Sequence, residues 1–108
     1  MPKSEIGPGA PFVSYPTVLY NKYRLAIMYE LYVAGAVEFV QLKSDLNLRD
    51  GALATHIRTL QNSGLVTAQK EPFGARTRTV YLITPKGINL LRKFFSHMLD
   101  RGSKIVNE

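Results

Sequence analysis

Basic and hydroxyl-bearing side chains form two groups in this sequence, and the first group surrounds a short glycine-containing stretch. It consists of Lys70, Arg76, Thr77 and Arg78, and Glu71 is the one acid between them. Guanidinium and ammonium groups at the tip of a connection suit contact with phosphate oxygens or insertion into a narrow minor groove. The same charges could instead only keep an exposed loop in solution. Their clustering favours the first explanation, a surface for a polyanion.

The second group lies on one side of residues 50–63, a segment with the pattern of an amphipathic helix. Leu53, Ile57 and Leu60 recur at helical spacing and predict a buried stripe. A helix whose opposite face is small and polar can enter the major groove of DNA and hydrogen-bond to base edges. An ordinary solvated face would look much the same. The residues away from the stripe are Gly51, Thr55, Arg58, Thr59 and Asn62; Ala52, like Gly51, would let the helix start approach a duplex closely, and His56 lies at the border of the stripe.

A second helix is predicted immediately before this one. Residues 39–46 carry apolar side chains at i, i+3 and i+7, which predicts one inward stripe. Asn47 favours a left-handed helix end. Asp50 is a favourable N-cap, because its carboxylate can accept amide protons at the start of the next helix. Together the two segments predict a helix, a tight turn and a second helix.

A β-hairpin is predicted after Gly64. Apolar runs at residues 65–68 and 80–83 have the composition of strands, and the connection over residues 72–78 contains a glycine. The short segment 36–38 can form a further strand that pairs with this hairpin. The hairpin would therefore carry the first basic group at its tip.

The first and last predicted helices carry more apolar surface than one small domain needs to bury. The first runs from Val18 to Ala34 with Thr17 as its N-cap, and the last from Pro85 to Arg101 after the strong start signal of Thr84. A helix that is apolar nearly all round needs burial on two sides, which a second copy of the chain would provide. We therefore expect a homodimer whose interface contains Leu19, Tyr20, Tyr23, Ile27, Leu91, Phe94, Phe95 and Met98.

Tyrosines on the first helix allow a further hypothesis. Tyr23, Tyr29 and Tyr32 could line a cleft between dimer helices that holds a small apolar effector. Packing in the core or at the interface explains the same residues and is the better explanation.

Length and composition limit the classes of function. A chain of 108 residues is one domain's worth, and we expect an extended or disordered arm over residues 1–16, the domain over 17–101 and a frayed tail over 102–108. The absence of cysteine excludes thiolate chemistry, and no metal-ligand set, phosphate-binding glycine loop or activated nucleophile is recognisable. We expect neither an enzyme nor a metal or other cofactor.

Charge and hydropathy concern partners and location. The formal net charge is +6 and the pI about 9.8, which gives the chain an electrostatic reason to meet a polyanion, although solubility alone would also explain it. The sequence contains no apolar run of the ~18 residues that a membrane span requires, and no signal peptide. The expected location is the cytoplasm, in association with the nucleoid.

The segment from Leu53 to Val66, LATHIRTLQNSGLV, resembles the helix-to-strand signature of winged-helix transcriptional regulators of the MarR and ArsR type. The segment from Gly74 to Gly87, GARTRTVYLITPKG, is similar to the wing and last strand of small prokaryotic regulators in this group. Two departures are Ala52, where many relatives have a polar residue, and Ala75, which interrupts the usual arginine pair. The resemblance covers roughly residues 24–95.

The resemblance implies a mainly α fold with a small β-hairpin wing, the winged helix-turn-helix, and a homodimer built from terminal helices. It also implies operator binding, with residues 50–63 in the major groove and the wing, residues 70–79, on the backbone or minor groove. By position, Thr55, His56, Arg58 and Thr59 would face DNA, and Arg76 and Arg78 would be wing contacts. His56 could equally be a structural histidine bonded to backbone.

These features together predict a sequence-specific regulator of transcription that binds double-stranded DNA. Two recognition helices would meet successive grooves about 34 Å apart. Salt-sensitive affinity would come from Lys43, Arg49, Arg76 and Arg78 on phosphates, and base discrimination from Thr55, Arg58 and Thr59. Two alternatives stay open: a non-specific, chromatin-like organiser of DNA, and a winged-helix module for protein interaction.

Overall fold

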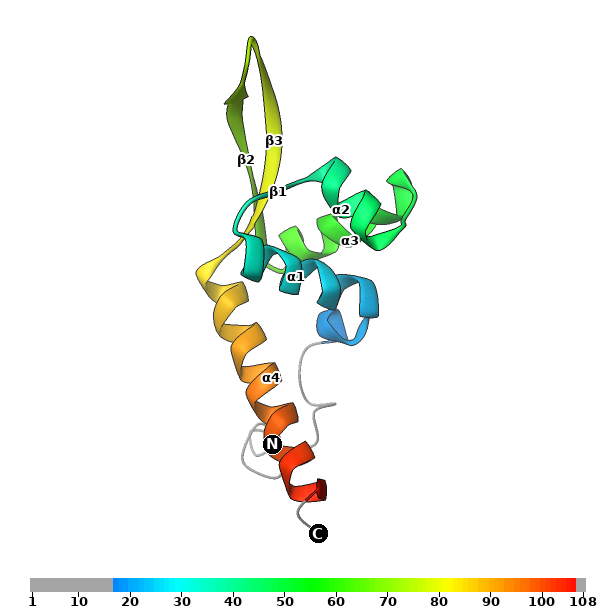
Figure 1. The fold of residues 1–108 in the computed structure, drawn as a ribbon, viewed down its shortest axis with the longest axis vertical. Helices are drawn as coiled ribbons and strands as arrows, with labels where there is room; N and C mark the ends of the chain where they lie inside the picture. Colours follow the sequence, from blue (N-terminus) through cyan, green and yellow to red (C-terminus); the bar gives the residue numbers. More distant parts are fainter. Residues whose placement is uncertain (1–16, 107–108) are drawn as a thin grey trace.

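The computed structural model describes residues 17–106 (Figure 1). The arm expected over residues 1–16 and the last two residues of the expected tail lie outside this part of the chain. In chain order the elements are the 3₁₀ helix η3 (Thr17–Tyr20), α1 (Lys22–Ala34), β1 (Val37–Glu38), α2 (Phe39–Leu46), α3 (Asp50–Asn62), β2 (Val66–Phe73), β3 (Arg76–Ile83) and α4 (Pro85–Val106). The predicted class, mainly α with a β-hairpin wing, is confirmed.

The first helix begins later than the sequence predicted. Asn21, and not Thr17, is the N-cap of α1: its Oδ1 accepts hydrogen bonds from the amides of Tyr23, at 2.9 Å, and Arg24, at 3.1 Å. Thr17 instead begins the separate 3₁₀ turn η3. Asparagine and threonine are both good capping residues, so composition alone did not separate the two sites. The helix ends at Gly35, whose φ of 91° few other residues adopt.

The two central helices form the predicted helix-turn-helix. The α2 helix ends at Asn47, which has the expected left-handed conformation with φ 53° and ψ 50°. The predicted capping role of Asp50 is wrong, because Arg49 is the N-cap residue of α3 and Asp50 is the first helical residue. The Asp50 carboxylate pairs with Lys43 instead, as described below. Leu53, Ile57 and Leu60 are buried as the helical spacing predicted.

The sheet is antiparallel and has the strand order β1-β3-β2. The β2–β3 hairpin is longer than predicted, because Phe73 pairs with Arg76 and the turn contains only Gly74 and Ala75. Gly74 has a φ of 65°, which suits glycine in so tight a turn. The predicted loop over residues 72–78 is therefore mostly strand. Figure 1 shows the hairpin projecting beyond the helices, with its tip far from α4.

The last helix is anchored by Thr84 and runs further than predicted. Thr84 Oγ1 accepts from the amide of Gly87 at 3.0 Å and donates to the carbonyl of Gly64 at 2.7 Å, which ties α4 to the end of α3. The helix continues through Gly102 to Val106, so the predicted end at Arg101 is wrong. A glycine within a helix costs only about 1 kcal/mol and need not end it. None of the helices within residues 17–106 is long and apolar enough to span a bilayer.

The core of the protomer contains half of the residues predicted for the dimer interface. Leu19, Ile27, Leu91 and Phe94 are all at most 3% exposed and belong to one core cluster that also contains buried side chains of α2, α3 and the sheet. These four residues cannot form a surface for a partner, and that part of the prediction is wrong. The small domain buries more of α1 and α4 than the apolar width of the helices suggested. The remaining four are Tyr20, Tyr23, Phe95 and Met98, all at least partly accessible.

Candidate nucleic-acid interface

The outer face of α3 has the exposure that the helical pattern predicted. Gly51, Ala52, Thr55, Arg58 and Asn62 are exposed, and Thr59 is half-buried. In the part of the chain that the structure describes, no carboxylate pairs with Arg58. This face therefore offers one free guanidinium donor among small side chains.

The two threonines of α3 turn their hydroxyl protons back into the helix. Thr55 Oγ1 donates to the carbonyl of Gly51 at 2.9 Å, and Thr59 Oγ1 donates to the carbonyl of Thr55 at 3.0 Å. In this arrangement each hydroxyl presents an acceptor oxygen and a methyl group outward and has no proton left to donate. Base amino groups and thymine methyl groups are the features of the major groove that match such a surface.

His56 is engaged with α1. Its Nδ1 lies 3.4 Å from Arg24 Nη1, and its ring centroid lies 5.7 Å from that of Tyr23. A guanidinium can only donate, so this contact requires an unprotonated Nδ1. Burial, and then the positive charge of Arg24, hold the pKa of His56 below the ordinary value of 6.5. Arg24 is itself held by a 3.0 Å hydrogen bond to the carbonyl of Val18. Of the two roles considered for His56, its contacts support the structural one.

The two cations near the helix-turn-helix corner differ in their surroundings. Lys43 Nζ lies 2.8 Å from Asp50 Oδ1, so its charge is neutralised by the first residue of α3. Arg49 is exposed at the N-cap of α3, and no carboxylate among the described residues pairs with it. Arg49 is therefore the freer of the two for a phosphate.

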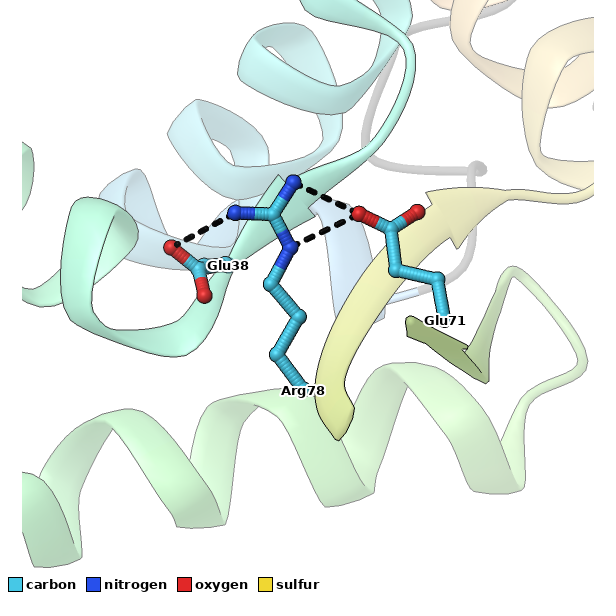
Figure 2. Close-up of polar contacts among 3 residues, drawn as sticks. All are labelled: Glu38, Glu71 and Arg78. Atoms are coloured by element: carbon cyan, nitrogen blue, oxygen red, sulfur yellow. Dashed lines mark hydrogen bonds and ion pairs between the residues drawn. The ribbon is translucent and has the colours of Figure 1, made fainter. Parts of the chain in front are cut away.

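Arg78, which sequence reasoning expected to contact DNA, lies between two acids and two residues from Arg76, the strand residue beside the turn of the wing. Its Nε and Nη2 donate to Glu71 Oε2 at 2.7 and 2.6 Å, and its Nη1 lies 3.6 Å from Glu38 Oε1. Figure 2 shows the guanidinium between the two carboxylates. Its carbon also lies 4.5 Å from the ring centroid of Phe73. We call Glu38, Glu71 and Arg78 the Arg78 cluster.

Two cations of the wing remain available: Arg76 beside the turn, and Lys70 one cross-strand pair further from the turn than Arg78. Lys70, Arg76 and Thr77 are exposed, and no carboxylate in the described part of the chain pairs with Lys70 or Arg76. Cross-strand partners share a face of the hairpin, so the pair Phe73–Arg76 and the pair Glu71–Arg78 lie on one face. Lys70 pairs with Thr79 and belongs to the other face. The wing thus offers an unpaired cation on each of its two faces.

Sequence reasoning missed Glu38, Glu71 and Phe73. A signal was present, because a two-residue turn at Gly74–Ala75 places Glu71 directly opposite Arg78. The longer loop assumed for this connection hid that register. The contact with Glu38 had no local signal, since it depends on β1 joining the sheet beside β3.

The tyrosines proposed for an effector cleft point to different neighbours. Tyr23 packs against His56 of α3, whereas Tyr29 meets Phe95 of α4 edge-on at 6.1 Å. Tyr29 and Tyr32 are both exposed. A common lining from all three is therefore not formed within the described part of one protomer.

Comparison with known proteins identifies the fold and the family. A family described as winged helix DNA-binding domain matches residues 23–101. A transcriptional regulator homologue from Pyrococcus horikoshii is 32% identical, with a TM-score of 0.77 over 87% of this chain and 92% of that one. The uncharacterized protein MJ0432 of Methanocaldococcus jannaschii is 33% identical over 76% of this chain and 89% of its own length.

A more distant solved structure shares the fold. A protein from Enterococcus faecalis assigned to the MarR family of transcriptional regulators is 23% identical, with a TM-score of 0.70 over 84% of this chain and 81% of that one. The free donors of α3 and of the wing tip lie on the two elements that give winged-helix proteins their name. The chain belongs to the winged helix DNA-binding domain family and has the fold of MarR-like transcriptional regulators.

Proposed function

We propose that this protein regulates transcription by binding specific sequences of double-stranded DNA as a homodimer. The α3 helix enters the major groove, and the wing contacts the adjacent backbone or minor groove. The observation that carries the proposal is the outer face of α3, which is exposed, free of acids beyond its first residue and equipped with one free arginine. A face of this size and chemistry fits the major groove.

Arg58 and the two threonines of α3 discriminate between bases. Arg58 is the long donor of the outer face and suits the O6 and N7 acceptors of guanine. Thr55 and Thr59 offer methyl groups and acceptor oxygens, which suit thymine methyls and the amino groups of adenine or cytosine. Gly51 and Ala52 keep the start of the helix thin enough for close approach.

Non-specific affinity for DNA comes from cations that have no acidic partner. Arg49 near the turn of the helix-turn-helix and Lys70 and Arg76 on the wing meet this condition among the residues described. Each phosphate that such a residue neutralises contributes about 0.9 to the slope of log K against log salt. Lys43 and Arg78 are excluded from this set because carboxylates already pair with them.

The dimer uses the outer sides of α1 and α4. Large apolar side chains remain exposed on both helices: Tyr29, Tyr32, Val33, Met98 and Leu99. In Figure 1, α4 runs well past the other helices, so among the described residues its far end has no neighbouring helix. A second copy packed on this surface would bury the exposed side chains and bring two recognition helices onto one duplex.

One observation favours a second candidate, an organiser of DNA without sequence preference. The outer face of α3 has a single charged donor, Arg58, which is few for a strongly discriminating helix. Affinity would then rest on Arg49, Lys70 and Arg76 alone.

Selection of genomic fragments by the purified protein, at near-physiological salt and read by sequencing, tests the proposal. A site-specific dimer enriches a palindrome. Uniform recovery of fragments supports the organiser. Recovery of no DNA by a folded protein contradicts both and points to a protein partner.

A further inference from the structure

We infer that Arg78 is a positioning residue of the wing: it ties the β2–β3 hairpin to the start of the helix-turn-helix through Glu71 and Glu38, and so aims the tip arginine, Arg76, at the DNA backbone. This inference rests on the proposed function for its consequence and on the geometry of the Arg78 cluster for its mechanism.

The guanidinium of Arg78 has little capacity left for DNA. Two of its nitrogens donate to Glu71 and a third faces Glu38 (Figure 2), and the ring of Phe73 lies beside its central carbon. Both edges of the group are therefore occupied by the protein. A phosphate would have to displace a carboxylate to reach it.

Charge leads to the same conclusion. Two carboxylates and one guanidinium leave the Arg78 cluster with one net negative charge. A phosphate placed beside the cluster would be repelled, whereas an unpaired arginine would attract it. The stretch of the wing at Glu71 and Arg78 is thus a poor site for the backbone, whereas the unpaired Arg76 beside the turn, and Lys70 on the other face of the hairpin, are better ones.

The position of the cluster explains what it could control. Glu71 belongs to β2 and Arg78 to β3, while Glu38 ends β1 and is the N-cap residue of α2. The three side chains therefore connect the projecting hairpin to the N-cap at the start of the helix-turn-helix. Arg76 lies two residues further out than Arg78 on the same face of the hairpin. A change of hairpin angle at the cluster is therefore carried to Arg76.

The decisive variant is Arg78→Lys, because lysine keeps the charge but has no planar fork that can serve two carboxylates. A positioning role predicts that Arg78→Lys and Arg78→Ala weaken DNA binding alike, by on the order of tenfold. In a background that lacks the unpaired wing cations, Lys70→Ala with Arg76→Ala, neither change should cost more than about twofold, since no free wing cation is left to position. Binding is measured on the selected duplex over a series of salt concentrations.

A direct phosphate contact predicts a different pattern. Arg78→Lys would then retain most of the affinity, and Arg78→Ala would lower the salt slope by about 0.9 even in the variant without Lys70 and Arg76. Glu71→Gln adds a test in which the two explanations predict opposite changes in DNA affinity. It removes a negative charge and should strengthen binding on electrostatic grounds alone, whereas loss of positioning weakens it. Retained affinity in Arg78→Lys, or stronger binding by Glu71→Gln, would overturn the inference.

A DNA-free measurement separates this inference from the proposed function. The chain has no cysteine, so Ser44→Cys on α2 and Ala75→Cys at the tip give two unique sites for spin labels. The distance distribution between the labels should broaden on Arg78→Lys while circular dichroism confirms that the variant is folded. An unchanged distribution would contradict positioning even if the protein binds DNA. A broadened distance distribution would support the positioning role of Arg78 even if the protein binds no DNA.

Discussion

Lys43 Nζ lies 2.8 Å from Asp50 Oδ1, so the last turn of α2 is ion-paired to the first residue of α3. Both side chains are largely exposed, and such a pair contributes little to stability. Its consequence is electrostatic. The pair neutralises the charge of Lys43 and leaves a carboxylate at the start of α3. Gly51 and Ala52, the residues proposed to approach DNA most closely, lie at this same end of the helix.

Asp50→Asn should therefore strengthen DNA binding. The change removes a charge that repels phosphate and releases Lys43, and we expect a gain of about three- to tenfold at low salt with a salt slope steeper by about 0.9. The free energy of unfolding should fall by no more than about 1 kcal/mol, because an acid is lost from the first turn of a helix. Asp100→Asn, near the far end of α4, is the control for net charge. Equal gains in both variants would refute a local effect.

The stability of the protein should depend on pH through His56. Because the pKa of His56 is lower in the folded state than its ordinary value of 6.5, the unfolded state binds more protons around and below that pH. Acidification from pH 7.5 to 5.5 should therefore lower the free energy of unfolding. Urea titrations at both pH values should show a smaller decrease for His56→Gln, whose amide oxygen can still accept from Arg24. The same decrease in both proteins would show that other groups control this range.

Gly87→Ala should destabilise the fold strongly. A Cβ at this position would collide with the carbonyl oxygen of Leu65 and lie 2.7 Å from Ile83 Cγ1, where α4 packs on the end of the sheet. Overpacking of this kind costs about 1–3 kcal/mol or more. Gly51→Ala is the matched control, since a Cβ added at Gly51 would have no neighbouring atom within 4 Å. It should keep or slightly raise stability while weakening DNA binding. Thermal melting that ranks the two variants equally would contradict the close approach at Gly87.

Leu99→Glu should dissociate the proposed dimer. Leu99 is 74% exposed in one protomer, so a charge there has no reason to unfold the monomer, but it would be buried in the proposed interface. Val40→Glu is the control, because Val40 is 72% exposed and lies on α2, away from that surface. Sedimentation velocity at micromolar concentration should show a monomer for Leu99→Glu and a dimer for the control. A wild-type protein that is monomeric would refute this interface outright.

Local features of the fold were readable from the sequence, and longer-range ones were not. The buried stripe of α3 and the left-handed Asn47 follow from neighbours within one or two turns, and both predictions are confirmed. The surroundings of Arg78 depend on hairpin register and on β1 pairing with β3, which a local pattern does not specify. Leu19 and Leu91 were expected at an interface because apolar width alone does not say whether a helix is covered by its own domain or by a partner.

The most direct test of the account compares the affinity of the wild-type protein and Arg58→Ala for the selected duplex and for a scrambled one. Gln61→Ala, exposed on the flank of α3, is the control. We expect wild type to prefer the selected duplex by at least about 10³-fold at physiological salt. Arg58→Ala should reduce that preference by roughly 5- to 150-fold, the equivalent of about 1–3 kcal/mol, with a much smaller loss on the scrambled duplex. Equal losses on both duplexes, or no preference in the wild-type protein, would contradict sequence readout by α3.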